Sequence, residues 1–329
     1  MNILITGASG FLGAYLLRQA VAEGFSVFAG VRASSNVSQF DDLENITFLD
    51  LPYHDPQKLE AFLFDCKQVY GKFDYIVHNA GLTKCRHKSD FDRVNFRYTK
   101  NFVEALVASD SVPTKFLFVS SLSAVSGGNN GIIRNSDLPQ PNTLYGMSKH
   151  YAEDFLESHP GFPYLTVRPT GIYGVGDKDY TIYLNTINHH IEPYLGSGKQ
   201  HVSFIFVTDL VELIFSMLRS EIVRRAYCVS DGKSYTQQQY AAIVKKALRR
   251  RTIKIVVPVF MLKAICNTLD WLGGLFGFVP TLNADKFRIL TARNWTCDIS
   301  DLRRDFDFHP KILLKKGVEE CVKAMRKIK

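Results

Sequence analysis

The chain has 329 residues, which is enough for one large α/β domain with an appended lobe or for two domains. Hydrophobic residues make up 46% and charged residues 22%, as in an ordinary packed globular protein. The formal charge of +8 lies largely in residues 245–254 and 315–329, where basic side chains are mixed with apolar ones at helical spacing. We therefore expect solvated helix faces there and no nucleic-acid partner, although a basic surface also attracts phosphorylated or carboxylated substrates.

The start of the chain and its cysteines indicate a reducing compartment. An apolar, β-branched strand begins at Asn2, which leaves no room for the basic and apolar regions of a secretory signal. The six cysteines, which form no C-x-x-C pair, are Cys66, Cys85, Cys228, Cys266, Cys297 and Cys321. This spacing favours free thiols over a disulfide framework or a zinc site, so we expect a cytoplasmic protein with no metal site.

The first thirteen residues predict a buried strand that runs directly into a glycine-rich turn. Gly7, Gly10 and Gly13 follow the strand as G-x-x-G-x-x-G, and apolar residues at helical spacing come next. Such a turn lets a pyrophosphate reach the free N–H groups of a helix N-terminus, and its last glycine lets the helix pack on the strand. The order of strand, glycine turn and helix predicts a dinucleotide site.

The second strand, residues 26–31, ends at Arg32 rather than at an acidic residue. NAD-binding units usually carry Asp or Glu about twenty residues beyond the glycines, where it binds the ribose 2′-hydroxyl. Arg32 lies nineteen residues after Gly13, and Ser34 and Ser35 follow it. A cation flanked by small hydroxyls suits a 2′-phosphate. We therefore predict NADP as the preferred cofactor, with NAD and a plain surface arginine as the alternative.

Strands and helices then alternate along the chain. We expect strands at residues 46–49, 73–77, 115–119, 164–167 and 201–207, and helices at residues 57–70, 90–106 and 210–218, the last capped by Thr208 or Asp209. This rhythm predicts an α/β fold with a doubly wound parallel (Rossmann) sheet. His78, at the end of one strand, is expected to support the packing or the backbone rather than to bind a metal.

The remaining segments lack this rhythm. We assign residues 1–172 plus 201–231 to a dinucleotide-binding domain and residues 173–200 plus 232–329 to a substrate-binding lobe. The most apolar window, residues 260–280, is interrupted by polar residues and glycines, so we expect a buried or ligand-lining helix and no transmembrane segment. Peripheral contact with a membrane is the lesser alternative.

Three residues predict proton transfer beside the cofactor. Ser121 ends a strand, Tyr145 follows 24 residues later, and Lys149 lies one helical turn beyond Tyr145 on the same face. An ammonium about 6 Å from the phenol, at an effective dielectric near 20, lowers the tyrosine pKa by about 2 units and makes it a general acid or base. Ser121 then holds the reacting oxygen. The alternative is a Tyr/Lys pair on a solvated helix with serines that bond only to local backbone.

These motifs together resemble the extended short-chain dehydrogenase/reductase family, also called the NAD-dependent epimerase/dehydratase family, over nearly the whole chain. The matching segments are residues 6–13 (TGASGFLG), 50–51 (DL), 78–81 (HNAG), 120–123 (SSLS), 145–149 (YGMSK), 168–174 (RPTGIYG) and 206–210 (FVTDL).

The resemblance implies site residues by position. Ser121, Tyr145 and Lys149 correspond to the catalytic triad, and Lys149 also holds the nicotinamide ribose. The implied cofactor-binding set is Gly7, Ser9, Gly10, Phe11, Leu12, Gly13, Arg32, Asp50, Leu51, Asn79, Ala80, Gly81, Asn95, Val119, Ser120, Tyr145, Lys149, Pro169, Thr170, Gly171 and Ile172. Within it, Asp50 and Leu51 correspond to adenine contacts.

Departures from the family pattern narrow the chemistry. Dehydratases of the family carry an Asp-Glu pair directly after the catalytic Ser or Thr, where this chain has Leu122 and Ser123. Many sugar epimerases carry Tyr-Gly where this chain has Val125 and Ser126. Arg32 in Gly-Val-Arg is similar to the dihydroflavonol-reductase and hydroxysteroid-dehydrogenase branches, which act on ketones or secondary alcohols.

We therefore predict an NAD(P)-dependent oxidoreductase that interconverts a ketone or aldehyde and an alcohol, on a small-molecule substrate that the sequence does not identify. A nucleotide-sugar epimerase that transiently oxidises its substrate is the first alternative. A non-catalytic dinucleotide-binding protein is the second. A homodimer is an expectation from the family alone.

Overall fold

A computed structural model describes residues 1–128, 131–195, 200–280 and 282–327. The described chain forms two compact units. Unit 1 contains Met1–Ser120, Met147–Val167 and Val211–Ala226, and unit 2 contains Ser121–Gly146, Arg168–Leu210 and Tyr227–Lys329. These units are defined by compactness, whereas the domains expected from the sequence are defined by the ligand that each would bind. The expected domain boundaries therefore stay a prediction.

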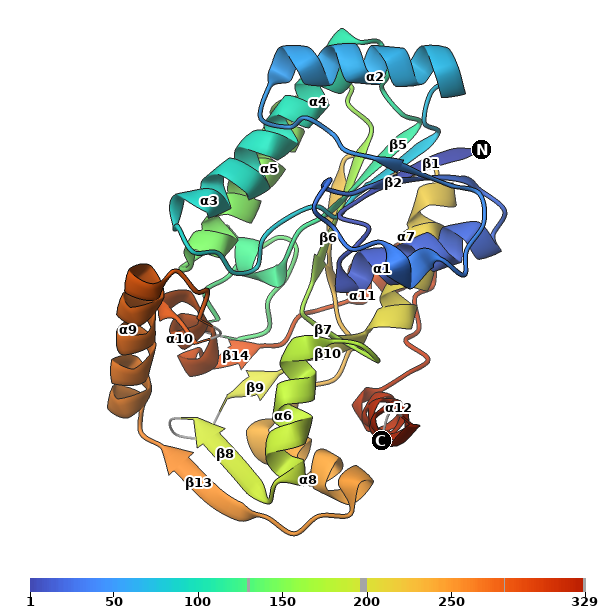
Figure 1. The fold of residues 1–329 in the computed structure, drawn as a ribbon. Helices are drawn as coiled ribbons and strands as arrows, with labels where there is room; N and C mark the ends of the chain where they lie inside the picture. The colour runs from blue at the N-terminus through green and yellow to red at the C-terminus, as the bar shows by residue number, and fades with distance from the viewer. Residues whose placement is uncertain (129–130, 196–199, 281, 328–329) are drawn as a thin grey trace. The chain divides into compact units, whose positions relative to one another are not determined.

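A seven-stranded sheet with the order β11-β6-β5-β4-β1-β2-β3 forms the core (Figure 1). Its strands are β1 (Asn2–Thr6), β2 (Ser26–Gly30), β3 (Ile46–Leu49), β4 (Tyr75–His78), β5 (Lys115–Val119), β6 (Tyr164–Pro169) and β11 (Arg225–Val229). Each neighbouring pair from β3 to β6 is parallel. This order is the doubly wound arrangement, and it confirms the predicted fold class.

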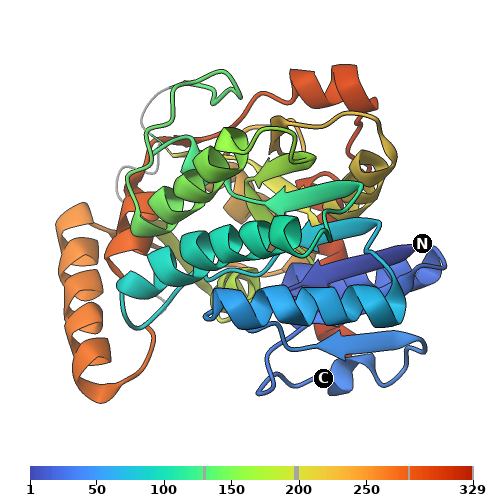
Figure 2. The same ribbon diagram turned by 90° about the horizontal axis from the view of Figure 1, so that it is seen from above.

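Helices cover both faces of the sheet (Figures 1 and 2). One face carries α2 (Pro56–Tyr70), α4 (Tyr98–Ala108) and α5 (Leu144–Ser158), and the other carries α1 (Phe11–Ala22) and α7 (Val207–Arg219). Leu63, Phe102 and Leu156 from the first three helices join one core cluster with Phe116 of β5. The strands are apolar at nearly every position because both of their faces are buried.

Unit 2 contains short sheets and helices. Several of them contribute to a second core cluster, which includes Leu184, Phe206, Val244 and Val318. Its elements are η3 (Leu122–Ala124), β7 (Gly171–Tyr173), α6 (Lys178–Asn188), β8 (Ile191–Leu195), β9 (His201–Val202), β10 (Phe204–Phe206), β12 (Tyr235–Thr236), α8 (Gln237–Leu248), β13 (Ile253–Val257), α9 (Val259–Phe276), α10 (Ala284–Thr291), β14 (Asn294–Trp295), α11 (Ser300–Phe306) and α12 (Leu314–Lys327). Strand β10 pairs with β7, β9 lies between β12 and β14, and β13 pairs with β8.

Several predicted elements were wrong in detail. The strand expected at residues 201–207 is two short strands in different sheets, separated by Ser203, whose hydroxyl donates to Trp295 O (2.7 Å). Helix α7 begins at Val207, so Thr208 and Asp209 lie inside its first turn rather than capping it. The charged run at residues 245–254 is helical only to Leu248 and continues into a strand.

The helix expected at residues 90–106 contains an irregular segment. It starts as α3 (Ser89–Phe91), widens into the π-helical turn η2 (Asp92–Arg97) and continues as α4. Such single π turns interrupt α-helices mostly at functional sites. Asn95, one of the predicted cofactor-binding residues, lies in this turn.

Of the two expectations for helix α9, buried or ligand-lining, burial is wrong, whereas its first residue, Val259, does line a cavity. Only Leu262, Cys266 and Gly273 are buried along its 18 residues. Gly273 and Gly274 lie inside the helix and do not break it. The chain after Gly277 folds back over Gly273, where a Cβ would lie 2.9 Å from Phe278 O. By length and composition α9 is long and apolar enough to cross a membrane, with a mean hydropathy of 1.2 over 18 residues.

The ends of β1 and β4 are joined by a buried hydrogen-bond network. The hydroxyl oxygen of Thr6 accepts the N–H groups of Asn79 (3.1 Å) and Ala80 (3.0 Å) and donates its proton to His78 Nδ1 (2.9 Å). Thr99 uses its own proton on Asn95 O, so its oxygen accepts from His78 Nε2 (3.0 Å). These roles fix a neutral His78. Burial, followed by the nearby Lys149 charge, lowers the pKa of His78 to about 3, which agrees with that state.

We predict that Thr6→Val destabilises the protein by about 1–3 kcal/mol, since two backbone N–H groups and a buried imidazole lose their partner at almost constant volume. Thr6→Ser keeps the hydroxyl and serves as the control. Urea denaturation gives the free energies of unfolding. Equal stability of the Val and Ser variants would show that the network contributes little.

Candidate functional site

The glycine turn brings the backbones after β1 and β4 unusually close. Gly7 has φ +65°, and a Cβ placed on it would lie 2.9 Å from the backbone of Ala80 and from Asn79 O. A Cβ on Gly13 would lie 2.1 Å from Gly7 O. Any larger residue at either position therefore forces the backbone apart, which explains both glycines.

Helix α1 starts at this turn with its N-terminus open. Gly10 is the N-cap residue and supplies no side-chain hydrogen bond, and the first turn carries no acidic residue. The first N–H groups of a helix have no partner within the helix, and the macrodipole favours an anion beside them. Ser9, Phe11 and Leu12 belong to the same turn.

The Arg32 loop lies against the glycine turn. Ser35 joins them, because the Arg32 backbone N–H donates to Ser35 Oγ (3.3 Å) and Ser9 Oγ donates to the same hydroxyl (3.4 Å). The Arg32 side chain is exposed. The loop also bonds to the end of β3, where Asp50 accepts from the backbone N–H of Ala33 (3.1 Å).

Leu51, the residue after Asp50, is buried. It packs against Gly30, where a Cβ would lie 3.1 Å from Leu51 Cδ1. The structure thus gathers four of the predicted cofactor-binding residues, Ser9, Arg32, Asp50 and Leu51, around the ends of β1, β2 and β3.

The residues after β4 are held by Asn95. Its Oδ1 accepts the N–H of Leu82 (2.7 Å), and its Nδ2 donates to Leu82 O (3.0 Å) and to Ser148 Oγ (3.0 Å). Asn95 is fully buried. Its amide is thereby committed to the backbone just after Gly81 and to helix α5, so its part in the site is to position them.

Lys149 lies at the end of β5. Its Nζ donates to Val119 O (2.8 Å) and lies 4.7 Å from the centre of the Phe118 ring. A Cβ on Gly81 would lie 3.1 Å from this Nζ and 3.0 Å from Asn95 Oδ1, so a larger residue would crowd both side chains. Burial lowers the pKa of Lys149 to about 8, against the opposing effect of Glu153.

Ser121 and Tyr145 come together within unit 2. Ser121 begins η3 and its Oγ accepts the N–H of Ser123 (3.2 Å). A hydrogen bond with Ser121 lowers the pKa of Tyr145, but burial is the larger effect and the net shift is upward. The lowering expected from Lys149 is thus not what the structure shows. The phenol keeps its proton at neutral pH, which is the form that can donate it.

The start of α5 fixes Tyr145. Its backbone N–H donates to Asp285 Oδ2 (3.1 Å), and the Gly146 N–H donates to Thr143 Oγ1 (2.9 Å). A Cβ on Gly146 would lie 2.3 Å from Ser123 O, so this glycine lets the helix press directly on the serine segment. Asp285 was not predicted as a site residue, because a lone acid 140 positions away carries no local signal. Gly146 lies within the matching segment 145–149 but was not predicted to have a role.

Residues 169–172, the last members of the implied cofactor-binding set, are held by backbone and side-chain hydrogen bonds. Thr170 Oγ1 donates to Ser203 O (2.9 Å), and its N–H donates to Val229 O (3.0 Å). Gly171 and Ile172 pair with β10 in parallel, and Pro169 ends β6. The predicted residues therefore fall into local groups within each unit, and α5 carries both Tyr145 and Lys149 at i, i+4 spacing.

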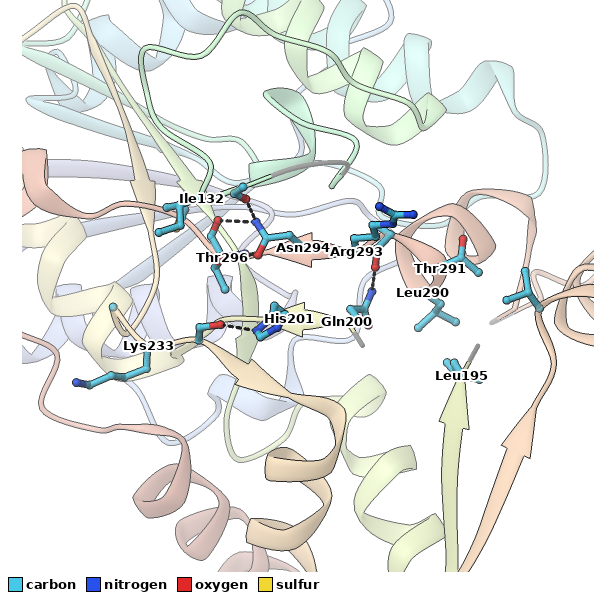
Figure 3. Close-up of a pocket in the computed structure, with 16 residues that line it drawn as sticks. Ile132, Leu195, Gln200, His201, Lys233, Leu290, Thr291, Arg293, Asn294 and Thr296 are labelled. Atoms are coloured by element: carbon cyan, nitrogen blue, oxygen red, sulfur yellow. Dashed lines mark hydrogen bonds between the residues drawn. The ribbon is translucent and has the colours of Figure 1, made fainter. Parts of the chain in front are cut away.

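A cavity of about 950 Å³ lies in unit 2 (Figure 3). Its lining combines apolar side chains with polar and basic ones: Ile132, Leu195, Gln200, His201, Lys233, Ser234, Val259, Leu290, Thr291, Arg293, Asn294 and Thr296. Gln200 donates to Ala292 O (2.8 Å), and Ser234 bonds to His201 Nδ1 (3.1 Å). All of these residues lie outside the recognised motifs, so the sequence did not single them out.

The sequence pattern of the NAD dependent epimerase/dehydratase family matches residues 3–229. The chain belongs to this family. The match confirms the resemblance and the prediction of an NAD(P)-dependent enzyme. A 3-beta-hydroxysteroid dehydrogenase of Mycolicibacterium neoaurum is 24% identical, over 98% of this chain and 90% of the relative.

Solved structures show the same fold. A UDP-glucose 4-epimerase of Thermotoga maritima, solved with UDP-glucose, has a TM-score of 0.79 at 19% identity and covers 100% of this chain and 99% of its own. A UDP-glucuronic acid 4-epimerase of Bacillus cereus, solved with NAD, has a TM-score of 0.76 at 17% identity, over 100% and 99% of the two chains.

The residues of this family member fit the dinucleotide that its family name implies. The glycine cradle has no room for a Cβ, the N-terminus of α1 has no side-chain cap, and Ser120 Oγ is buried at the end of β5 without a hydrogen-bond partner among the described residues. Buried hydroxyls normally have partners, so an orphaned one points to a missing ligand.

We predict that Gly146→Ala lowers kcat at least tenfold, because the new methyl group displaces Tyr145 and Ser121 from each other. Gly274→Ala is the matched control: it is also a helical glycine, but a Cβ there meets nothing within 4 Å. Steady-state kinetics with circular dichroism separates this displacement from unfolding. Unchanged kcat in a folded Gly146→Ala variant would contradict it.

Proposed function

We propose that this enzyme interconverts a ketone or aldehyde and a secondary or primary alcohol by hydride transfer, with Tyr145 as the general acid or base. The observation that carries the proposal is the protonated Tyr145 hydrogen-bonded to Ser121, with Lys149 one helical turn away on α5. The hydroxysteroid dehydrogenase relative, whose name describes alcohol oxidation at a secondary carbon, supports this reaction class.

A bound nicotinamide supplies or accepts the hydride, and the chain handles the proton and the oxygen. Ser121 Oγ donates a hydrogen bond to the reacting oxygen, and Tyr145 delivers its phenolic proton to it. Lys149, anchored by Val119 O, then stabilises the phenolate electrostatically and offers N–H groups to the cofactor ribose. Leu122 and Ser123, both buried, provide no carboxylate for a dehydration.

The cofactor preference is part of the proposal. We assign the exposed Arg32 to the 2′-phosphate of NADP, supported by its loop packing on the glycine turn through Ser35. The alternative cofactor is NAD, with which the UDP-glucuronic acid 4-epimerase of similar fold was solved. Cytoplasmic location and a homodimer stay predictions.

A nucleotide-sugar epimerase is the second candidate, and the cavity in unit 2 favours it in one respect. Lys233 and Arg293 line this cavity, and two cations suit a diphosphate. The UDP-glucose 4-epimerase of similar fold is consistent with this candidate. Isomerisation of a UDP- or GDP-sugar with no net change in nicotinamide absorbance would favour the epimerase, whereas stoichiometric cofactor turnover on a ketone or alcohol would favour the oxidoreductase.

We predict that Tyr145→Phe lowers kcat about 10²- to 10⁴-fold without weakening cofactor binding, because only the proton is removed. Tyr151→Phe, on the exposed side of the same helix, is the control. Absorbance at 340 nm over a panel of ketones, aldehydes and alcohols, with fluorescence titration of NADPH, measures both quantities. Wild-type turnover by Tyr145→Phe would overturn the mechanism, and an inactive wild type that binds cofactor normally would favour the non-catalytic alternative.

We predict that wild type binds NADPH more tightly than NADH and that Arg32→Gln weakens NADPH binding about 10- to 100-fold, the effect of losing a charged hydrogen bond of about 1.5–3 kcal/mol. NADH binding should not change. Arg97→Gln, which removes an exposed arginine paired with Asp92, controls for net charge. A wild type without preference, or a preference that survives Arg32→Gln, would show that Arg32 does not bind the phosphate.

A further inference from the structure

Helix α9 has an inner and an outer side. The buried residues Leu262, Cys266 and Gly273 recur at helical spacing and face the rest of unit 2. Asp270, the acid of this helix, accepts the N–H of Ala284 at the start of α10 (3.0 Å). Figure 1 shows α9 beside α10, directly after strand β13. The helix is therefore held along its length by the protein.

The outer side is largely apolar as well, with Asn267 and Thr268 as its exposed polar residues. Phe260, Trp271 and Leu275, spaced 11 and 4 residues apart, lie on the face opposite the buried stripe and are 73%, 66% and 62% exposed. A surface helix in water normally carries polar residues on this side. Phe276, the last residue of the helix, is 71% exposed, and Phe278 and Val279 extend the exposed apolar residues beyond the helix end.

Strand β13, on the other side of Pro258, also exposes apolar side chains. Ile253 and Ile255 lie on one face of this strand and Val256 on the other, and β13 pairs with β8 in a sheet of two strands. We call α9, β13 and residues 276–279 together the α9 surface. Scattered exposed apolar residues are normal, but a contiguous set on consecutive elements marks an interaction site.

The exposed charged side chains of α9 and β13 are basic, and the acid of α9, Asp270, accepts the N–H of Ala284. Residues 232–269 contain no Asp or Glu and eight basic residues: Lys233, Lys245, Lys246, Arg249, Arg250, Arg251, Lys254 and Lys263. Lys245 is paired with the buried Glu192 (2.7 Å). Arg251, Lys254 and Lys263 are exposed beside the apolar residues. Apolar and aromatic side chains flanked by Lys and Arg are the composition of helices that lie in the interface of anionic membranes.

We propose that the α9 surface docks this protein on an anionic lipid bilayer, with α9 lying in the headgroup region parallel to the membrane. A second copy of the chain fits the surface less well, since a two-fold contact would bring the same basic residues face to face. A spanning helix also fits less well, because the inner stripe and Asp270 tie α9 to unit 2.

The first test uses the two tryptophans of the full-length protein. Trp271 is exposed, whereas Trp295 is 7% exposed and donates to Ile289 O (2.9 Å). With phosphatidylcholine/phosphatidylserine vesicles, we expect a blue shift of the emission and quenching by brominated lipids. Trp271→Phe should remove both signals while the protein still sediments with the vesicles.

Sedimentation with the same vesicles measures binding itself. The double substitution Phe260→Glu and Leu275→Glu should weaken binding at least tenfold, and each of Arg251→Gln, Lys254→Gln and Lys263→Gln should weaken it about fivefold. Val69→Glu, at an exposed apolar residue of α2, is the control and should have no effect. Circular dichroism verifies that the variants fold.

Three results would overturn the proposal: no binding of wild type to the charged vesicles, equal binding by the double-Glu variant, or quenching that persists without Trp271. A wild-type dimer in lipid-free ultracentrifugation that the double-Glu substitution dissociates, together with no vesicle binding, would assign the surface to a second copy instead.

Discussion

The close contact between the backbones that follow β1 and β4 is the constraint on which the candidate site depends. Strand β1 lies at the point where the sheet order reverses, so the chain turns to β2 on one side and to β4 on the other. Ligands of open parallel sheets bind outside the strand ends at such a point. Gly7 has no Cβ and Thr6 bonds the backbone of the β4 end, so the two strand ends can meet there.

The same close packing recurs wherever a predicted site residue must be placed. Gly81 leaves room for the Lys149 ammonium, and Gly146 leaves room for the serine segment beneath Tyr145. Polar side chains then hold the segments that the glycines allow to come close. Asn95 bonds to the backbone after β4 and to α5, and Asp285 bonds to the first turn of α5. The positions of the predicted catalytic side chains thus depend on close backbone contacts and on the hydrogen bonds of Asn95 and Asp285, more than on the catalytic side chains themselves.

This division explains what the sequence could predict. Residues 46–49 and 115–119 coincide with β3 and β5, because continuous apolar runs bounded by polar residues have few alternatives. The glycine turn and the Tyr/Lys spacing are local patterns, so they were readable. Asp285 and the cavity lining come from segments far apart in the sequence, and nothing local connects them. Strand β11 has only Tyr227, Cys228 and Val229 buried, too short an apolar run to identify it as the seventh strand.

The misjudged helix α9 shows why hydrophobicity alone does not imply burial. Helix α12 of the same unit follows the usual rule, with Leu314, Val318 and Val322 buried and its lysines exposed. In α9 the inner stripe is buried in the same way, but the outer face is also apolar. Both helices have one side already packed against protein, so packing within the chain cannot account for the difference. The apolar outer side of α9 instead suits contact with an apolar partner, and the basic residues beside it favour a partner with negative charge, as in the proposed anionic bilayer.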